Sequence, residues 1–186
     1  ALAGVALGGF VNFMTIAFVT GMASGVQATA ARRLGEGKTE AMAIPLNGGL
    51  LLAAIISVPA SIAMFFLAPS VMASLAEDTQ VASMGGAYLQ CRVVAMVAVG
   101  MNFAFRGYWN ATNRSRLYLR TLVVMHVCNV LISYVLIFGK LGLPALGVVG
   151  AGIGTAASTF IGLAYYCWLG LVHARDAGFL KGIPKG

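Results

Sequence analysis

Charged residues are scarce in this chain of 186 residues: 9% are Asp, Glu, Lys or Arg, and 60% are hydrophobic. Soluble domains carry about 25% charged residues, so this composition excludes an ordinary soluble domain and indicates an integral membrane protein. Acidic residues are the rarest group, with five Asp and Glu against twelve Lys and Arg. Because the basic residues lie between apolar runs rather than on one face, their excess predicts membrane topology and not a nucleic-acid partner.

Cysteine is also scarce, and all three cysteines, Cys91, Cys128 and Cys167, lie inside apolar runs. Their spacing fits neither a disulfide framework nor a zinc site, and we interpret them as buried small hydrophobic residues. The sequence has no nucleotide-binding pattern, no Ser/His/Asp order and no paired acids within its apolar runs. We therefore expect neither an enzyme nor a bound cofactor.

Long apolar runs dominate the rest of the sequence, each long enough to cross about 30 Å of hydrocarbon. Short polar loops separate the runs. We expect residues 1–174 to form one all-α domain with five transmembrane helices, followed by a cytoplasmic linker or tail over 175–186. The predicted spans are residues 3–31, 41–68, 84–105, 119–138 and 148–172.

The basic residues predict the orientation of the chain. If the five spans alternate direction, nearly all Lys and Arg fall on one side and only Lys140 on the other. By the positive-inside rule, the chain then starts outside and ends in the cytoplasm, as a multi-pass protein of the inner (plasma) membrane in contact with lipid. The residues on the basic side are Arg32, Arg33, Lys38, Arg106, Arg114, Arg116, Arg120, Arg175, Lys181 and Lys185.

The last two predicted spans have distinctive patterns of polar and small residues. His126, Asn129 and Ser133 are separated by three and four positions, which puts them on one face of a helix. In the next span a small residue recurs every fourth position, a pattern that lets another helix approach closely. The residues of this small-residue seam are Gly150, Gly154, Ser158 and Gly162.

Four longer stretches share a family likeness: ASGVQATAARRLGEGK, YLQCRVVA, NFAFRGYWNATNRSR and NVLISYVLIFGKLGLPALGVVGAGIGTA. They resemble the N-terminal half of the multidrug and toxic compound extrusion (MATE) transporters, from that family's second helix onward. The likeness covers most of the chain, and the last stretch is the most specific. Relatives in the same superfamily flip lipid-linked sugars, so the resemblance indicates the fold more firmly than the cargo.

The resemblance implies a transporter of twelve helices, built as two six-helix lobes around a cavity, that exchanges small organic cations for H+ or Na+. The first helix and the C-terminal lobe of such a protein are missing from this sequence. The chain is therefore expected to be most of one lobe, with those missing parts as its partners, and to require no cofactor apart from the coupling ion.

The resemblance also suggests site residues. In the family's archaeal and related members, the helix that matches residues 119–138 carries an Asn and, four residues later, an Asp, and both take part in cation coupling. Asn129 matches the Asn, but Ser133 stands at the position of the Asp. Thr155 falls where some members have a cavity-lining Thr. Because no predicted span contains a carboxylate, the coupling acid is expected elsewhere, unless coupling follows another route.

Four other polar residues of the predicted spans have two readings each. His126 either carries a proton beside Asn129 or holds two helices together by a hydrogen bond. Arg92 is either a structural anchor or a substrate contact. Gln27 and Asn47 either bind neighbouring helices or line the ion and substrate pathway.

Three functions remain open from the sequence. The leading hypothesis is a part of a cation-coupled antiporter that exports organic, often cationic drugs or toxic compounds by alternating access. A second keeps the fold and changes the cargo to a lipid-linked glycan, which Arg92 and His126 would favour. A third is a membrane scaffold or remnant that transports nothing.

Overall fold

The computed structural model describes residues 2–181, and these residues form helices and loops without any strand. This confirms the predicted all-α class. The helices are α1 (Leu2–Ile16), η1 (Ala17–Thr20), α2 (Gly21–Gly35), η2 (Thr39–Ala41), α3 (Ile44–Leu75), α4 (Thr79–Val94), α5 (Met96–Ala111), α6 (Ser115–Phe138) and α7 (Gly147–His173).

Four stretches of the described chain are long and apolar enough to cross a membrane, and the bent pair α4 and α5 makes a fifth when it is counted as one span. The four are Leu2–Gly35, Thr39–Leu75, Ser115–Phe138 and Gly147–His173. Four or five spans agree with the five predicted from hydropathy, and the predicted span 84–105 corresponds to the bent pair.

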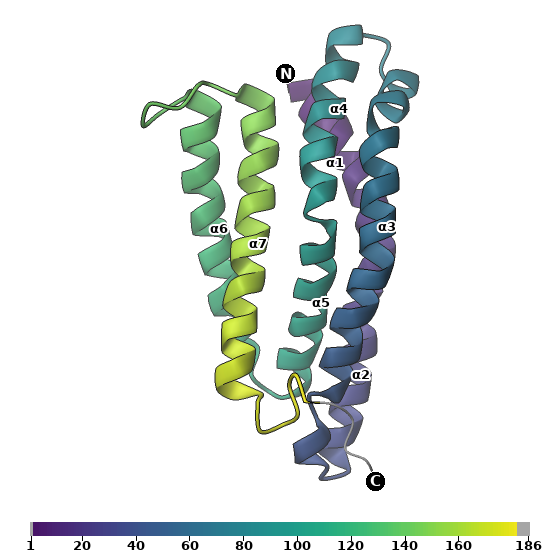
Figure 1. Ribbon diagram of the computed structural model, residues 1–186, viewed down its shortest axis with the longest axis vertical. Coiled ribbons are helices and arrows are strands. Elements are labelled where there is room, and N and C mark those ends of the chain that lie inside the picture. Colours follow the sequence, from purple (N-terminus) through teal and green to yellow (C-terminus); the bar gives the residue numbers. More distant parts are fainter. Residues whose placement is uncertain (1, 182–186) are drawn as a thin grey trace.

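The helices form two groups that lie side by side along the long axis (Figure 1). In the first, which we call the bundle, α1 packs against α4, α2 packs against α5, and α3 contacts both α4 and α5. In the second, which we call the hairpin, α6 and α7 pack along each other. Helix α7 joins the two groups through contacts with α4 and α5.

Two spans of the bundle are interrupted. The η1 turn separates α1 from α2, and a break separates α4 from α5. The η1 turn contacts α5. The break between α4 and α5 falls at Ala95 and bends the pair by 48°. A break frees backbone groups that lipid cannot satisfy, so a neighbouring side chain has to take over. The hydroxyl of Ser61 on α3 does so by donating to the carbonyl oxygen of Val93.

Glycines allow the helices of the bundle to approach backbone to backbone. A Cβ on Gly8 of α1 would lie 3.0 Å from the carbonyl oxygen of Gly85 on α4. A Cβ on Gly107 of α5 would run into the carbonyl oxygen of Ala23 on α2. Such contacts strengthen helix packing where lipid removes the hydrophobic driving force.

An aromatic core lies between α5, α7 and the segment that follows α7. The rings of Phe105 and Tyr166 stack with their centroids 5.2 Å apart, and Phe179 packs edge-on against Phe105 at 5.7 Å. Phe179 is only 2% exposed. The described part of the expected linker, residues 175–181, therefore folds back onto the helices.

Candidate functional site

The hairpin is held together by the predicted small-residue seam. A Cβ on Gly150 would lie 2.7 Å from the carbonyl carbon of Leu136, and one on Gly154 would meet Ser133. The outer face of α6 is instead exposed and apolar, at Val123, Val127 and other large residues. The spacing of small residues predicts the close approach of another helix, and in the structure that helix is α6. The exposed face is suited to lipid.

A hydrogen-bond chain crosses the seam at its third residue. The Nδ2 of Asn129 on α6 donates to Oγ of Ser158 on α7 at 3.3 Å. The Ser158 hydroxyl in turn donates to the carbonyl oxygen of Thr155 at 2.9 Å. Ser158 is 2% exposed, whereas Asn129 is half-buried. The two hydrogen bonds thus connect a partly accessible amide on α6 to a backbone carbonyl oxygen of α7 through a buried hydroxyl.

A second asparagine reaches the same part of α7 from the bundle. The Nδ2 of Asn102 on α5 donates to the carbonyl oxygen of Thr159 at 3.2 Å. The Thr159 hydroxyl donates to the carbonyl oxygen of Thr155 at 2.7 Å. The Oδ1 of Asn102 is buried and has no hydrogen-bond partner among the described residues. We call Asn102, Asn129, Thr155, Ser158 and Thr159 the polar junction.

A cavity of about 220 Å³ adjoins the polar junction between α5, α6 and α7. The guanidinium carbon of Arg106 lies 5.3 Å from the ring centroid of Tyr118 and 5.9 Å from that of Phe103, distances at which a cation is attracted to a ring face. An apolar, aromatic lining with a few polar groups is typical of small-molecule sites. The lining residues are Val99, Asn102, Phe103, Arg106, Tyr118, Leu122, Met125, Thr159 and Tyr166.

The structure brings together only part of the predicted polar stripe on α6. Asn129 and Thr155 both belong to the polar junction. Ser133 lies one turn further along and packs on Gly154, where a small residue is needed. His126 is exposed, beside the apolar outer face of α6. Ion-pathway roles for His126 and Ser133 stay predictions.

Asn47 has partners far from the polar junction. Its Nδ2 donates to the carbonyl oxygens of Gly178 at 2.9 Å and Lys181 at 3.1 Å. Its Oδ1 accepts from the backbone N–H of Leu180 at 3.0 Å. Asn47 thus holds the segment that follows α7, a role that sequence spacing gave no means of finding.

The two remaining candidates lie on other helices of the bundle. Gln27 is exposed on α2. Arg92 on α4 is half-buried, and its Nε is enclosed without a hydrogen-bond partner among the described residues. A place in the ion or substrate pathway stays a prediction for both.

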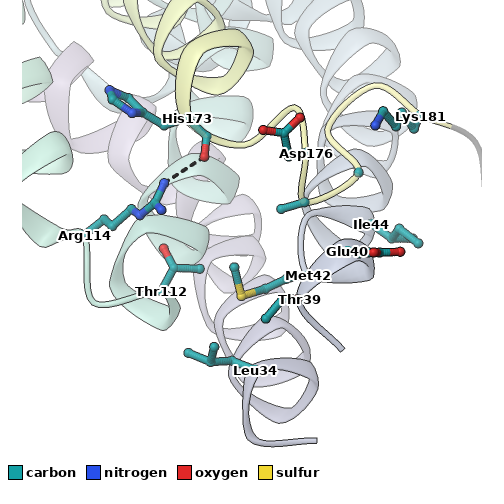
Figure 2. A pocket seen from close by; sticks show the side chains of 12 residues that line it. Leu34, Thr39, Glu40, Met42, Ile44, Thr112, Arg114, His173, Asp176 and Lys181 are labelled. Carbon is teal, nitrogen blue, oxygen red and sulfur yellow. Dashed lines mark hydrogen bonds between the residues drawn. The ribbon is translucent and has the colours of Figure 1, made fainter. Parts of the chain in front are cut away.

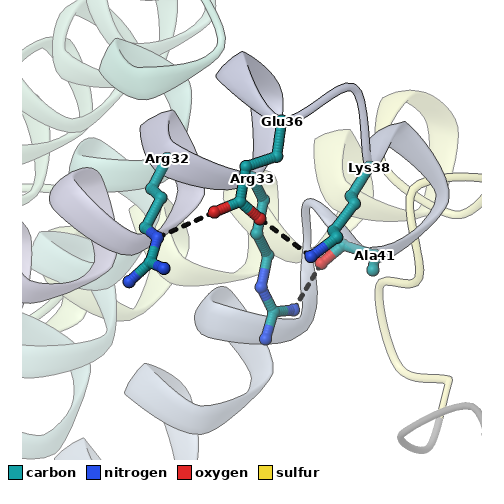
Figure 3. Close-up of polar contacts among 5 residues, drawn as sticks. All are labelled: Arg32, Arg33, Glu36, Lys38 and Ala41. Carbon is teal, nitrogen blue, oxygen red and sulfur yellow. Dashed lines mark hydrogen bonds and ion pairs between the residues drawn. The ribbon is translucent and has the colours of Figure 1, made fainter.

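The acidic residues lie at helix ends and in loops. Asp78 caps α4 by accepting from the backbone N–H groups of Gln80 and Val81. Glu36 accepts from Lys38 at 2.9 Å and Arg32 at 2.8 Å (Figure 3). These hydrogen bonds, that of Lys38 first, lower the pKa of Glu36 below its ordinary value. No group of three metal-ligating residues occurs in the described chain.

A larger recess of about 940 Å³ opens near the ends of α2, α5 and α7 (Figure 2). Its charged lining residues have both signs, among them Glu40, Asp176 and Lys181. Arg114 closes one side by donating to the carbonyl oxygen of His173 at 2.7 Å. This recess has lining residues of both charges and shares none of them with the polar junction. Its described lining residues form no group that could hold a metal ion.

The fold and the polar junction together define a class: a multi-pass helical membrane protein with polar groups and a cavity between its spanning helices. Comparison with known proteins gives the family. The model of the MatE family matches residues 1–135, which is most of the chain, and the chain belongs to this family of transporters.

Curated relatives carry the name "Probable multidrug resistance protein NorM". That of Agrobacterium fabrum is 30% identical over 155 residues, which cover 82% of this chain and 32% of the relative. That of Aromatoleum aromaticum is 29% identical over 177 residues, which cover 94% of this chain and 37% of the relative. The chain thus spans about a third of the length of the relatives that it matches.

Solved structures share the fold. An outward-facing MATE transporter matches with a TM-score of 0.83 at 22% identity, over 94% of this chain and 38% of its own. An inward-facing one matches with a TM-score of 0.77 at 19% identity, over 89% and 36%. A MATE protein in complex with MaD5 matches with a TM-score of 0.84 at 22% identity, over 99% and 41%.

Proposed function

We propose that this chain is the greater part of one lobe of a cation-coupled antiporter that exports organic, often cationic, compounds by alternating access. The single observation that carries the proposal is the polar junction, which lies between spanning helices and beside a cavity in a chain of the MatE family. Polar groups within membrane spans are costly and are usually kept for ions, substrates or helix contacts.

The named relatives support the cargo part of the proposal. They are described as multidrug resistance proteins, and this chain aligns with about a third of their length. The full transporter then includes further helices and a second lobe, which supply the rest of the cavity. A coupling carboxylate belongs in those parts, since the described acids lie at helix ends and in loops. The coupling ion is H+ or Na+.

The distribution of basic residues supports an orientation in the inner membrane. Arg32, Arg33 and Lys38 lie at the end of α2 and in the loop after it, and Arg114 lies between α5 and α6, whereas Glu77 and Asp78 lie between α3 and α4. The first group of loops also carries Glu36 and Glu40, but its basic residues are in excess. By the positive-inside rule the basic end is cytoplasmic, so the chain starts outside and ends inside.

Efflux from cells that lack their own drug exporters tests the function. The full-length protein is expected to lower accumulation of a broad panel of organic cations, ethidium among them. Asn129→Ala is expected to lower efflux at least about tenfold, because polar contacts in a binding site carry much of the specificity. Val130→Ala, which changes the exposed neighbour, is the control at equal expression. Unchanged accumulation across the whole panel by the unaltered protein contradicts the proposed function.

A further inference from the structure

The cavity between α5, α6 and α7 carries a single charge, and that charge is positive. Among its described lining residues, Arg106 alone is ionised at neutral pH. No acid of the described chain balances this charge within the cavity, because the acidic residues lie at helix ends and in loops. The electrostatic potential of Arg106 therefore attracts a negative group into the cavity and disfavours a bare cation.

Aromatic rings position the guanidinium of Arg106 without using its hydrogen-bond donors. Its central carbon lies 5.3 Å from the ring centroid of Tyr118 on α6 and 5.9 Å from that of Phe103 on α5. Contacts with ring faces use the charge of the guanidinium and leave its five N–H donors for other partners. The ion pairs of the described chain are both those of Glu36, so no described carboxylate pairs with Arg106. Arg106 is exposed, and a ligand can reach it.

The size and the lining of the cavity indicate which part of a ligand fits. Its volume of about 220 Å³ is below the range of about 300–1,000 Å³ for sites that enclose a whole drug-sized ligand, so it accommodates one end of such a molecule. The rings of Phe103, Tyr118 and Tyr166 line it, and ring faces favour a flat aromatic group. A planar guanidinium binds a carboxylate through two parallel hydrogen bonds. The group that fits both features is an aromatic ring that bears a carboxylate.

We propose that this cavity binds the aryl carboxylate end of an anionic or zwitterionic substrate, and that Arg106 selects this end by pairing with the carboxylate. This inference rests on the proposed function and adds a class of substrate to it. A zwitterion keeps its positive group on the part of the molecule that stays outside the cavity. An organic cation without an acidic group gains no hydrogen bond from Arg106 and is repelled by its charge.

Two dyes that differ in one group test the proposal. The acid dye is a rhodamine with a free carboxylate on its pendant phenyl ring, and the ester dye is the methyl ester of the same rhodamine. The Kd of each is measured by fluorescence anisotropy with the full-length transporter in nanodiscs of phosphatidylcholine. The unaltered protein is expected to bind the acid dye about tenfold more tightly than the ester dye, the lower end of the range for a hydrogen bond to a charged group.

Variants of Arg106 assign this selectivity to its guanidinium. Arg106→Gln removes the charge and is expected to raise the Kd of the acid dye about tenfold, while the Kd of the ester dye stays within about twofold. Arg106→Lys keeps the charge without the planar fork and is expected to raise the Kd of the acid dye about threefold. If Arg106→Gln gives no folded protein, the lysine variant decides. Because each dye is the reference for the other, general damage to the cavity raises both Kd values together.

The matched control is Arg120→Ala, which removes another exposed arginine. Arg120 is two residues from Tyr118 on α6, so it lies on the opposite side of that helix, and it does not line the cavity. This variant is expected to change neither Kd.

Three results would overturn the inference. The first is equal affinity of the unaltered protein for the two dyes, and the second is an Arg106→Gln variant that shifts both Kd values alike. The third is a preference for the acid dye that disappears when the nanodiscs contain phosphatidylglycerol, because Arg106 then pairs with a lipid phosphate. Uptake into proteoliposomes is measured separately. If the unaltered protein transports neither dye and no cation of the panel, the proposed function fails, whereas the ratio of the two Kd values still decides the inference.

Discussion

The bundle and the hairpin achieve close packing in different ways. In the bundle, two paired spans are broken and glycines bring backbone against backbone, as at Gly107 and Ala23. In the hairpin, both helices run without a break, and the seam meets side chains as well as backbone, with Gly162 against the end of Met125. At Gly107 the bundle is therefore sensitive to an added carbon, whereas the hairpin has room to adjust at Gly162.

The largest predicted difference contrasts two glycines of these groups. Gly107→Ala is expected to remove most of the folded protein, because its Cβ meets the backbone of Ala23, which cannot move aside. Overpacking costs about 1–3 kcal/mol even when side chains can shift. The Cβ of Gly162→Ala meets the side chain of Met125 at Sδ and Cγ, which can change rotamer, and this variant is expected to fold nearly normally. Size-exclusion profiles and melting temperatures in detergent measure both; equal behaviour of the two variants would refute the contrast.

A smaller effect is expected where the chain returns from the hairpin to the bundle. Phe179→Ala removes a ring that is 2% exposed between the two groups, and truncation of a buried Phe costs about 3 kcal/mol or more. When the segment 175–181 is released from the helices, trypsin cleaves it after Arg175 and Lys181. The cleavage rate is expected to rise about a hundredfold, the factor that corresponds to about 3 kcal/mol.

The matched control for that experiment is Leu180→Ala, which changes the neighbouring residue of the same segment. The Leu180 side chain is 68% exposed. It is expected to leave the cleavage rate unchanged. Asn47→Ala, which removes three hydrogen bonds to residues 178–181, is expected to fall between the two. Cleavage of all three variants at one rate would show that the segment is not docked.

The smallest effect is expected at an exposed residue that takes no part in the helix packing of the bundle or of the hairpin. Glu36 is exposed, and its lowered pKa means that its ion pairs stabilise the fold above the ordinary value of 4.5 and lose this effect as the pH falls below it. Exposed pairs are screened by salt, so Glu36→Gln is expected to melt like the unaltered protein at pH 7 and 150 mM salt. A large drop in melting temperature at pH 7 would contradict this reading.

The sequence predicted the hairpin better than the bundle, for physical reasons. The four-residue repeat of the seam is local information, and the structure confirms that another helix, α6, packs closely against it. The break at Ala95 carries no Gly or Pro at that position, so hydropathy predicted one span there. Helix α3 continues through Pro59 and Pro69 to Leu75, beyond its predicted end at 68, because a proline removes only one hydrogen bond of a long helix.

The candidate site was predictable only in part. Asn129 and Thr155 came from the family resemblance, and Ser158 was recognised as a packing residue alone. The contact of Asn102 with Thr159 joins residues 57 positions apart, and that of Asn47 with Gly178 joins residues 131 positions apart. No local pattern encodes such pairs, because they depend on how the helices pack.

The most direct test of the central claim is whether a transported cation reaches the hairpin at Asn129. In a full-length protein whose Cys91, Cys128 and Cys167 are replaced by Ala, Asn129→Cys is expected to react with a water-soluble thiol reagent, and ethidium is expected to slow that reaction. Val130→Cys, on the exposed apolar face, is expected to react slowly with or without ethidium. An Asn129→Cys thiol that stays unreactive, or whose labelling ethidium does not slow, would contradict the account.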